Sequence, residues 1–171
     1  MKNVIKTLAI VAALLTFTST TVNAQKIAHI NRDSLISKMP EWKQAQDSVK
    51  AYAAELEQLI AGMSNEYQAK LTSYEATYKD LPEISRAAKE QEIKDLGQRI
   101  QDVQQRAQMD YQNLTTSLTE PIYEKANNAI KAVAKKNNYR YVLDTSSQVI
   151  IYYQDSDDIF VLVAKHMGLS L

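Results

Sequence analysis

The chain has 171 residues, and its 20 basic and 20 acidic side chains leave it with no net charge. A neutral chain has no overall electrostatic attraction to nucleic acid, so we expect no nucleic-acid partner. The absence of cysteine excludes disulfides, thiol nucleophiles and thiolate metal sites. With only three glycines and three prolines, the chain has little room for long flexible linkers.

Residues 1–24 have the pattern of a cleaved secretory signal peptide. A basic start, MKNVIK, precedes the apolar run TLAIVAALLTF, and TSTTVNA ends in small residues before a cut after Ala24. The apolar run is shorter than the roughly 20 residues that span a bilayer, so we expect no stable membrane insertion. The alternative is an uncleaved N-terminal anchor. Cleavage predicts an exported, periplasmic protein that starts at Gln25 and has the size of one domain.

Residues 25–40 are expected to form a short strand and one helical turn. KIAHI, residues 26–30, alternates in polarity and is rich in residues that favour strands. The polar stretch RDSLISKMP follows, and its helical turn is expected to end before Pro40, because a proline disfavours helical geometry at the residue before it.

Residues 41–119 are predicted to form a long antiparallel helical hairpin. From Trp42 to Met63 the apolar residues recur at alternating spacings of three and four, which is typical of a coiled-coil seam. A second seam of similar length runs from Ile93 to Ile122. Pro82 lies between the two seams and cannot continue a helix, so we place the tip of the hairpin there.

Residues 120–171 are predicted to return to a small mixed region. Pro121 indicates the start of a new amphipathic helix, because a proline is tolerated in a first turn. Two strand candidates follow, YRYVLD and QVIIYY, at residues 139–144 and 148–153. DSDD, residues 155–158, then suggests a helix cap, and a last apolar helix is expected to stop at Gly168.

The predicted fold class is therefore α+β and mostly helical, with a hairpin arm (residues 41–119) on a base (residues 25–40 and 120–171). Three short strands make a poor sheet alone, and their apolar edges are unprotected. We therefore expect the base to oligomerise. The strand residues that we expect to contribute to this association are Ile27, Ile30, Val142, Leu143, Val149 and Ile151.

The two ends of the mature chain resemble the Skp/OmpH family of periplasmic chaperones for outer-membrane proteins. The resemblance is carried by KIAHINRDSLISKMPEWKQAQ and by PIYEKANNAIKAVAKKNNYRYVLDTSSQVIIYYQDSDDI, with long helical arms between them. Membership would imply a homotrimer whose arms enclose unfolded outer-membrane proteins, here called clients, without ATP. Basic arms are associated with this family, whereas residues 41–119 carry four more acidic than basic side chains. This departure argues against lipopolysaccharide capture.

No catalytic, cofactor or metal motif is recognisable, so we expect a protein that is not an enzyme and needs no cofactor. His29 and His166 are far apart, and His29 is expected to be a satisfied or surface strand residue. Along the arm, Tyr74 and Tyr78 are the first candidates for client contact, because they lie near the tip with few neighbours. Tyr52, Tyr67 and Tyr111 are secondary candidates, since the alternative is that they pack one helix against the other.

Two functions are compatible with these features. The first is an ATP-independent periplasmic holdase that binds unfolded outer-membrane proteins between its arms and prevents their aggregation. The alternative is an exported coiled-coil scaffold or adaptor that binds one folded partner of the cell envelope.

Overall fold

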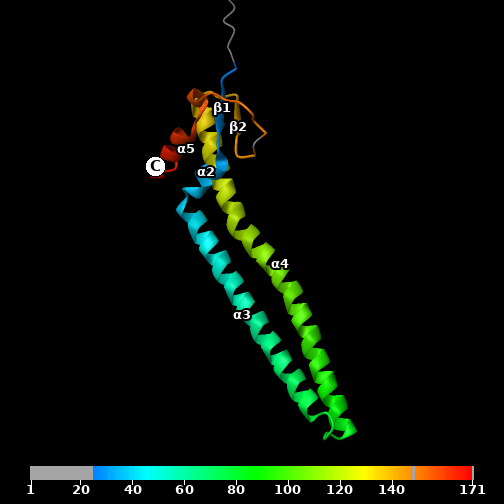
Figure 1. The fold of residues 1–171 in the computed structure, drawn as a ribbon. Helices are drawn as coiled ribbons and strands as arrows, with labels where there is room; N and C mark the ends of the chain where they lie inside the picture. Colours follow the sequence, from blue (N-terminus) through cyan, green and yellow to red (C-terminus); the bar gives the residue numbers. More distant parts are fainter. Residues whose placement is uncertain (1–24, 148, 171) are drawn as a thin grey trace, which may run out of the picture.

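The computed structural model describes residues 25–147 and 149–170. The predicted signal peptide, residues 1–24, lies outside the described residues. The fold is a long helical hairpin that projects from a small mixed base (Figure 1). This confirms the predicted fold class, α+β and mostly helical.

The arm consists of helix α3, Pro40–Thr77, and the first two thirds of helix α4, Glu83–Lys136. The two helices run side by side in opposite directions and are joined by a short turn (Figure 1). Pro40 is the first residue of α3, where its missing N–H is harmless. Pro82 precedes α4 in an extended conformation, with φ of −60° and ψ of 151°, and so separates the two helices.

The prediction that a new helix starts at Pro121 is wrong, because α4 continues through this residue into the base (Figure 1). A proline inside a helix removes one backbone hydrogen bond, which costs about 3 kcal/mol. Beyond Pro121 the apolar stripe of α4 is buried in the base at Ile122, Ala126 and Val133. This burial offsets the lost bond, and one continuous helix therefore connects arm and base.

The base is built around two short parallel strands, β1 (Ile27–Ile30) and β2 (Tyr141–Asp144). Ile27 pairs with Tyr141 and Ile30 with Asp144, so the two strands lie in register over their full length. Helices α2 (Arg32–Ser37), α5 (Phe160–His166) and the end of α4 contribute to a common core. Leu35, Ile159 and Val163 are fully buried within it.

The second strand candidate, residues 148–153, is not a strand where the structure describes it. Residues 149–153 have no regular structure, and Gln148 lies outside the described residues. The edge of β1 that does not pair with β2 is occupied by Asp158 and Ile159. His29 forms a bridge with Asp158, and the His29 carbonyl accepts the N–H of Ile159 at 3.0 Å. Among residues 25–147 and 149–170 of a single copy, residues 149–153 therefore have no strand partner.

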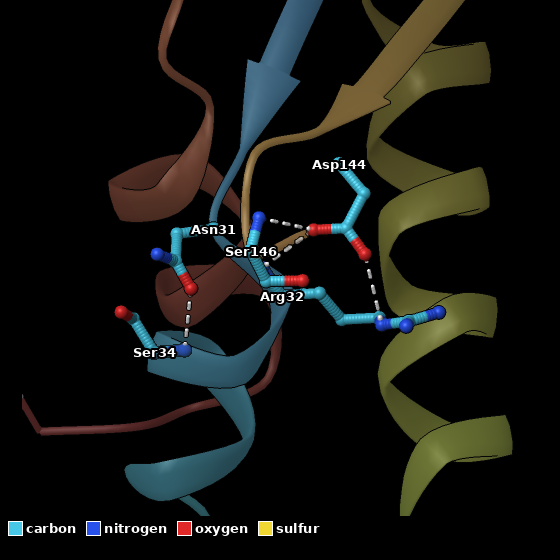
Figure 2. A network of polar contacts seen from close by, with 5 residues as sticks. All are labelled: Asn31, Arg32, Ser34, Asp144 and Ser146. Carbon is cyan, nitrogen blue, oxygen red and sulfur yellow. Dashed lines mark hydrogen bonds and ion pairs between the residues drawn. The ribbon is translucent and has the colours of Figure 1, made fainter. Parts of the chain in front are cut away.

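The ends of the two strands are joined by a polar network around Asp144 (Figure 2). The Asp144 carboxylate accepts the backbone N–H of Ser146 at 3.0 Å and forms an ion pair with Arg32, whose Nε lies 3.2 Å away. The Arg32 guanidinium also lies 5.4 Å from the centre of the Tyr123 ring on α4. The neighbouring Asn31 caps α2 by accepting the Ser34 N–H at 2.8 Å.

Turn geometry in the base agrees with the residue types that the sequence places there. Asn138, after α4, has a positive φ of 58°, and Gly168, after α5, has a φ of 70°. Asp155–Asp157 form a single 3-10 turn, and the Asp158 carboxylate accepts the Phe160 N–H at 2.7 Å. The N-cap residue of α5 is Ile159, which makes no side-chain cap hydrogen bond, so the prediction that DSDD caps this helix is wrong.

Candidate functional site

The tip of the arm holds the two first candidates, Tyr74 and Tyr78, in contact with each other. Their rings meet edge to face with centres 5.6 Å apart. The Tyr74 hydroxyl donates to the Glu90 carboxylate, and the Arg86 guanidinium lies 5.1 Å from the centre of the Tyr78 ring. These contacts join α3 to α4 and leave Tyr78 44% exposed.

The Tyr74 phenol is the most perturbed titratable group of the tip. Loss of hydration raises its pKa to about 12, and the hydrogen bond to the negatively charged Glu90 acts in the same direction. The phenol therefore remains protonated, and remains a hydrogen-bond donor, across the whole physiological range.

In the middle of the arm, Tyr67 packs against the opposite helix. Gly97 of α4 faces the Tyr67 ring, whose nearest atom would lie 3.4 Å from a Cβ at that position. Close by, Lys70 bridges Glu92 across the hairpin and Glu66 along its own helix. The hydrogen bond from Lys70 lowers the pKa of Glu92, but these groups are exposed, so they contribute more to helix register than to stability.

Two apolar grooves lie between α3 and α4 in the half of the arm nearer the base. One has a volume of about 520 Å³ and the other about 620 Å³. Tyr111 lines both grooves and is 38% exposed. Tyr52, the remaining tyrosine candidate, is half-buried and does not line either groove.

The base carries most of its predicted association residues on its surface. Ile27 is 44% exposed, Leu143 39%, Val149 76% and Ile151 98%, while Val142 is half-buried. Ile30 is different, because it is 1% exposed and belongs to the core of the chain itself. Ile27 and Ile30 are three positions apart in β1, so strand alternation places them on opposite faces, and grouping both as association residues overlooked this signal.

His29 is buried at 4% exposure and serves the fold of the base. Its Nε2 lies 2.9 Å from the carbonyl oxygen of Gln154, and its ring lies 4.1 Å, centre to centre, from that of Tyr153. Within residues 25–147 and 149–170, no three histidine or acidic side chains come together as a metal site. Nor does any helix in these ranges combine the length and apolar character needed to cross a bilayer.

Comparison with known proteins decides the family. The family model described as Outer membrane protein (OmpH-like) matches residues 26–167, which is most of the chain. The chain belongs to the OmpH-like family. A curated relative, the Chaperone protein Skp of Pectobacterium atrosepticum, is 25% identical over 148 residues, which cover 84% of this chain and 86% of that protein.

A solved structure supports the OmpH-like fold independently of sequence. An OmpH-like protein from Caulobacter crescentus CB15 matches with a TM-score of 0.73, and the match covers 89% of this chain and 90% of that one. Its sequence identity is 13%, so this likeness concerns the fold alone. The family resemblance carried by the two ends of the sequence is confirmed, and the chain is a member of the Skp/OmpH-like outer membrane chaperones.

Proposed function

We propose that this OmpH-like chain is an ATP-independent periplasmic holdase for unfolded outer-membrane proteins. The observation that carries the proposal is the arm itself, in which the 38-residue helix α3 pairs with the first two thirds of the 54-residue helix α4 and few side chains are fully buried. Such an arm presents a long, partly apolar surface outside the core of the base. A surface of this kind suits adaptable contact with unfolded chains, because an isolated pocket would accept only one ligand shape.

The proposed activity is passive. A protein that binds unfolded chains lowers their free concentration by mass action and needs no nucleotide to do so. Release follows when the client folds into the outer membrane, because lipid then covers the apolar surface of the barrel. Tyr74, Tyr78 and, secondarily, Tyr52, Tyr67 and Tyr111 are proposed as contact residues.

The active form is proposed to be a homotrimer joined through the base. The exposed apolar residues Ile27, Leu143, Val149 and Ile151 support self-association, because a monomer would leave them in water. Residues 149–153 have no strand partner in the part of the chain that the structure describes, and a second copy could supply one. Ile30 and the half-buried Val142 would support this surface from within.

The decisive experiment measures aggregation of a urea-unfolded outer-membrane β-barrel after dilution. We expect the mature protein to suppress light scattering at a stoichiometric ratio, without ATP. Absence of suppression would reject the holdase, and recovery of a single folded partner in pull-downs would favour the scaffold alternative. Static light scattering should give about 50 kDa for three mature copies, against about 17 kDa for one, at roughly 110 Da per residue.

A further inference from the structure

The two grooves of the arm meet and form one continuous surface. Ala53 and Tyr111 line both of them. One groove continues along Leu56, Ile60 and Ala107, and the other along Trp42, Val49 and Thr119. Together they are called the double groove. From residue 42 to residue 61 of α3, it extends for about 28 Å, at 1.5 Å per residue. This length accommodates about eight residues of an extended polypeptide.

The α4 wall of the double groove carries no charge. Its members are Gln104, Ala107, Gln108, Tyr111, Thr115 and Thr119. The charged residues of α4 between positions 100 and 119 are Asp102, Arg106 and Asp110. Their spacing of four residues places them on a single stripe, and none of them lines either groove. The charges of this helix are therefore separated from the groove.

The α3 wall adds a small acidic excess. Asp47 and Glu57 line the double groove together with Lys50, which leaves one net negative charge. This net negative charge would repel an acidic segment of polypeptide but not a neutral segment. Glutamine amides both donate and accept hydrogen bonds, so Gln104 and Gln108 can pair with the unsatisfied backbone of an unfolded chain.

We infer that the double groove binds an extended, apolar segment of unfolded polypeptide that carries no acidic side chains. The inference deepens the proposed holdase function, on which it rests, by naming the class of segment that the arm selects. Binding is stabilised by apolar burial between the helices and by amide hydrogen bonds along α4. Because few charges take part, this binding should be almost insensitive to salt.

The test uses the full mature protein and two fluorescent peptides of eight residues. Both alternate apolar and polar positions, and the polar positions carry either threonine or glutamate. We expect the threonine peptide to bind with the same Kd, within about twofold, at ~50 mM and ~500 mM salt. At the lower salt concentration, the glutamate peptide should bind at least about fivefold more weakly than the threonine peptide, because the groove carries a net negative charge. Preference for the glutamate peptide would overturn the inference, as would strongly salt-dependent binding of the threonine peptide.

Two neighbouring alanines of α3 provide a matched pair of variants. Ala53 lines both grooves, whereas Ala54 is exposed and lines neither. Ala53→Glu should raise the Kd for the threonine peptide by about tenfold, because a charge would be desolvated beneath the bound segment. Ala54→Glu should change it by less than about twofold. Circular dichroism checks that both variants keep the same helix content.

The outcomes separate this inference from the holdase function. If the wild type suppresses β-barrel aggregation and Ala53→Glu binds the peptide as Ala54→Glu does, the groove is not the binding surface, although the holdase stands. If the wild type suppresses no aggregation and binds no peptide, both proposals fail. Weaker binding by Ala53→Glu alone supports the double groove.

Discussion

The base and the arm of this protein are stabilised in different ways. In the base, residues from β1, α2, α4 and α5 are buried together, although Ala28 and Ala164 at the two ends of this set are 136 positions apart in the sequence. Along the described arm beyond the base core, the buried apolar residues are Leu96 and Ala107, each 8% exposed. The base is therefore a cooperative core, and the arm is a local pairing that keeps part of its apolar surface available.

The largest expected effect comes from a cavity in the base. Leu35 is fully buried, so Leu35→Ala should lower the free energy of unfolding of the base by about 2–5 kcal/mol. Leu59→Ala, at a position 51% exposed on the arm, is the matched control and should cost far less. Chemical denaturation followed by circular dichroism measures both. Equal losses would show that the arm and the base are not stabilised differently.

The next effect concerns the Asp144 network and depends on pH. Burial opposes ionisation of Asp144, but hydrogen bonds from Ser146 and Arg32 and the charge of Arg32 outweigh it, so its pKa lies below the usual 3.8. The ionised carboxylate therefore stabilises the fold above about pH 4, and this stabilisation is lost as the pH falls through the lowered pKa.

Asp144→Asn should cost about 1 kcal/mol at pH 7, a value reduced because the side chain is one-third exposed. The difference from the wild type should shrink below pH 4, in thermal melts recorded across the pH range. A loss that stays constant down to pH 2 would show that ionisation of Asp144 does not contribute.

A smaller effect, of opposite sign, is expected in the arm. Gly62 lies within α3, and an added Cβ there would meet no atom within 4 Å. Gly62→Ala should therefore stabilise the arm by about 0.5–1 kcal/mol through helix propensity. Hydrogen exchange of the α3 amides measures this change locally. Gly97→Ala is the comparison. Its Cβ would contact the Tyr67 ring, so it should stabilise the arm by no more than Gly62→Ala does. Faster exchange in Gly62→Ala would contradict the prediction.

The smallest effect is expected at the tip. Tyr74→Phe removes the hydroxyl that donates to Glu90 but keeps the ring contact with Tyr78, so thermal stability should hardly change. The spectroscopic titration should change more clearly. Absorbance at the tyrosinate band should lose the component that titrates near pH 12, because the Tyr74 pKa is raised to about 12. Persistence of that component in Tyr74→Phe would assign it to another tyrosine.

Much of the architecture was predictable because it follows from local patterns. The three-and-four spacing from Trp42 onward predicts a paired helix, and Pro82 predicts a break, since both depend on neighbours in sequence. The resemblance at the two ends predicts the family, which the family model confirms. Asn138 and Gly168 take the positive φ values that their residue types allow.

The errors occurred where long-range packing outweighs local preference. Pro121 locally indicates a helix start, but the buried stripe at Ile122, Ala126 and Val133 carries α4 through it. The stretch VIIYY has strong strand preference, yet Asp158 and Ile159 take the edge of β1 that such a strand would need. Strand formation requires a partner, and composition cannot supply one.

In the candidate site, too, some features follow from the sequence and others depend on long-range packing. The sequence alone shows that the arm carries tyrosines and an acidic excess, because charge and side-chain type do not depend on folding. The surroundings of each tyrosine depend on packing: Tyr74 and Tyr78 contact each other one turn apart at the end of α3, while Tyr111 borders two grooves that exist only between paired helices. Periodicity specifies which face of a helix is apolar, but only the partner helix determines how much of that face is covered.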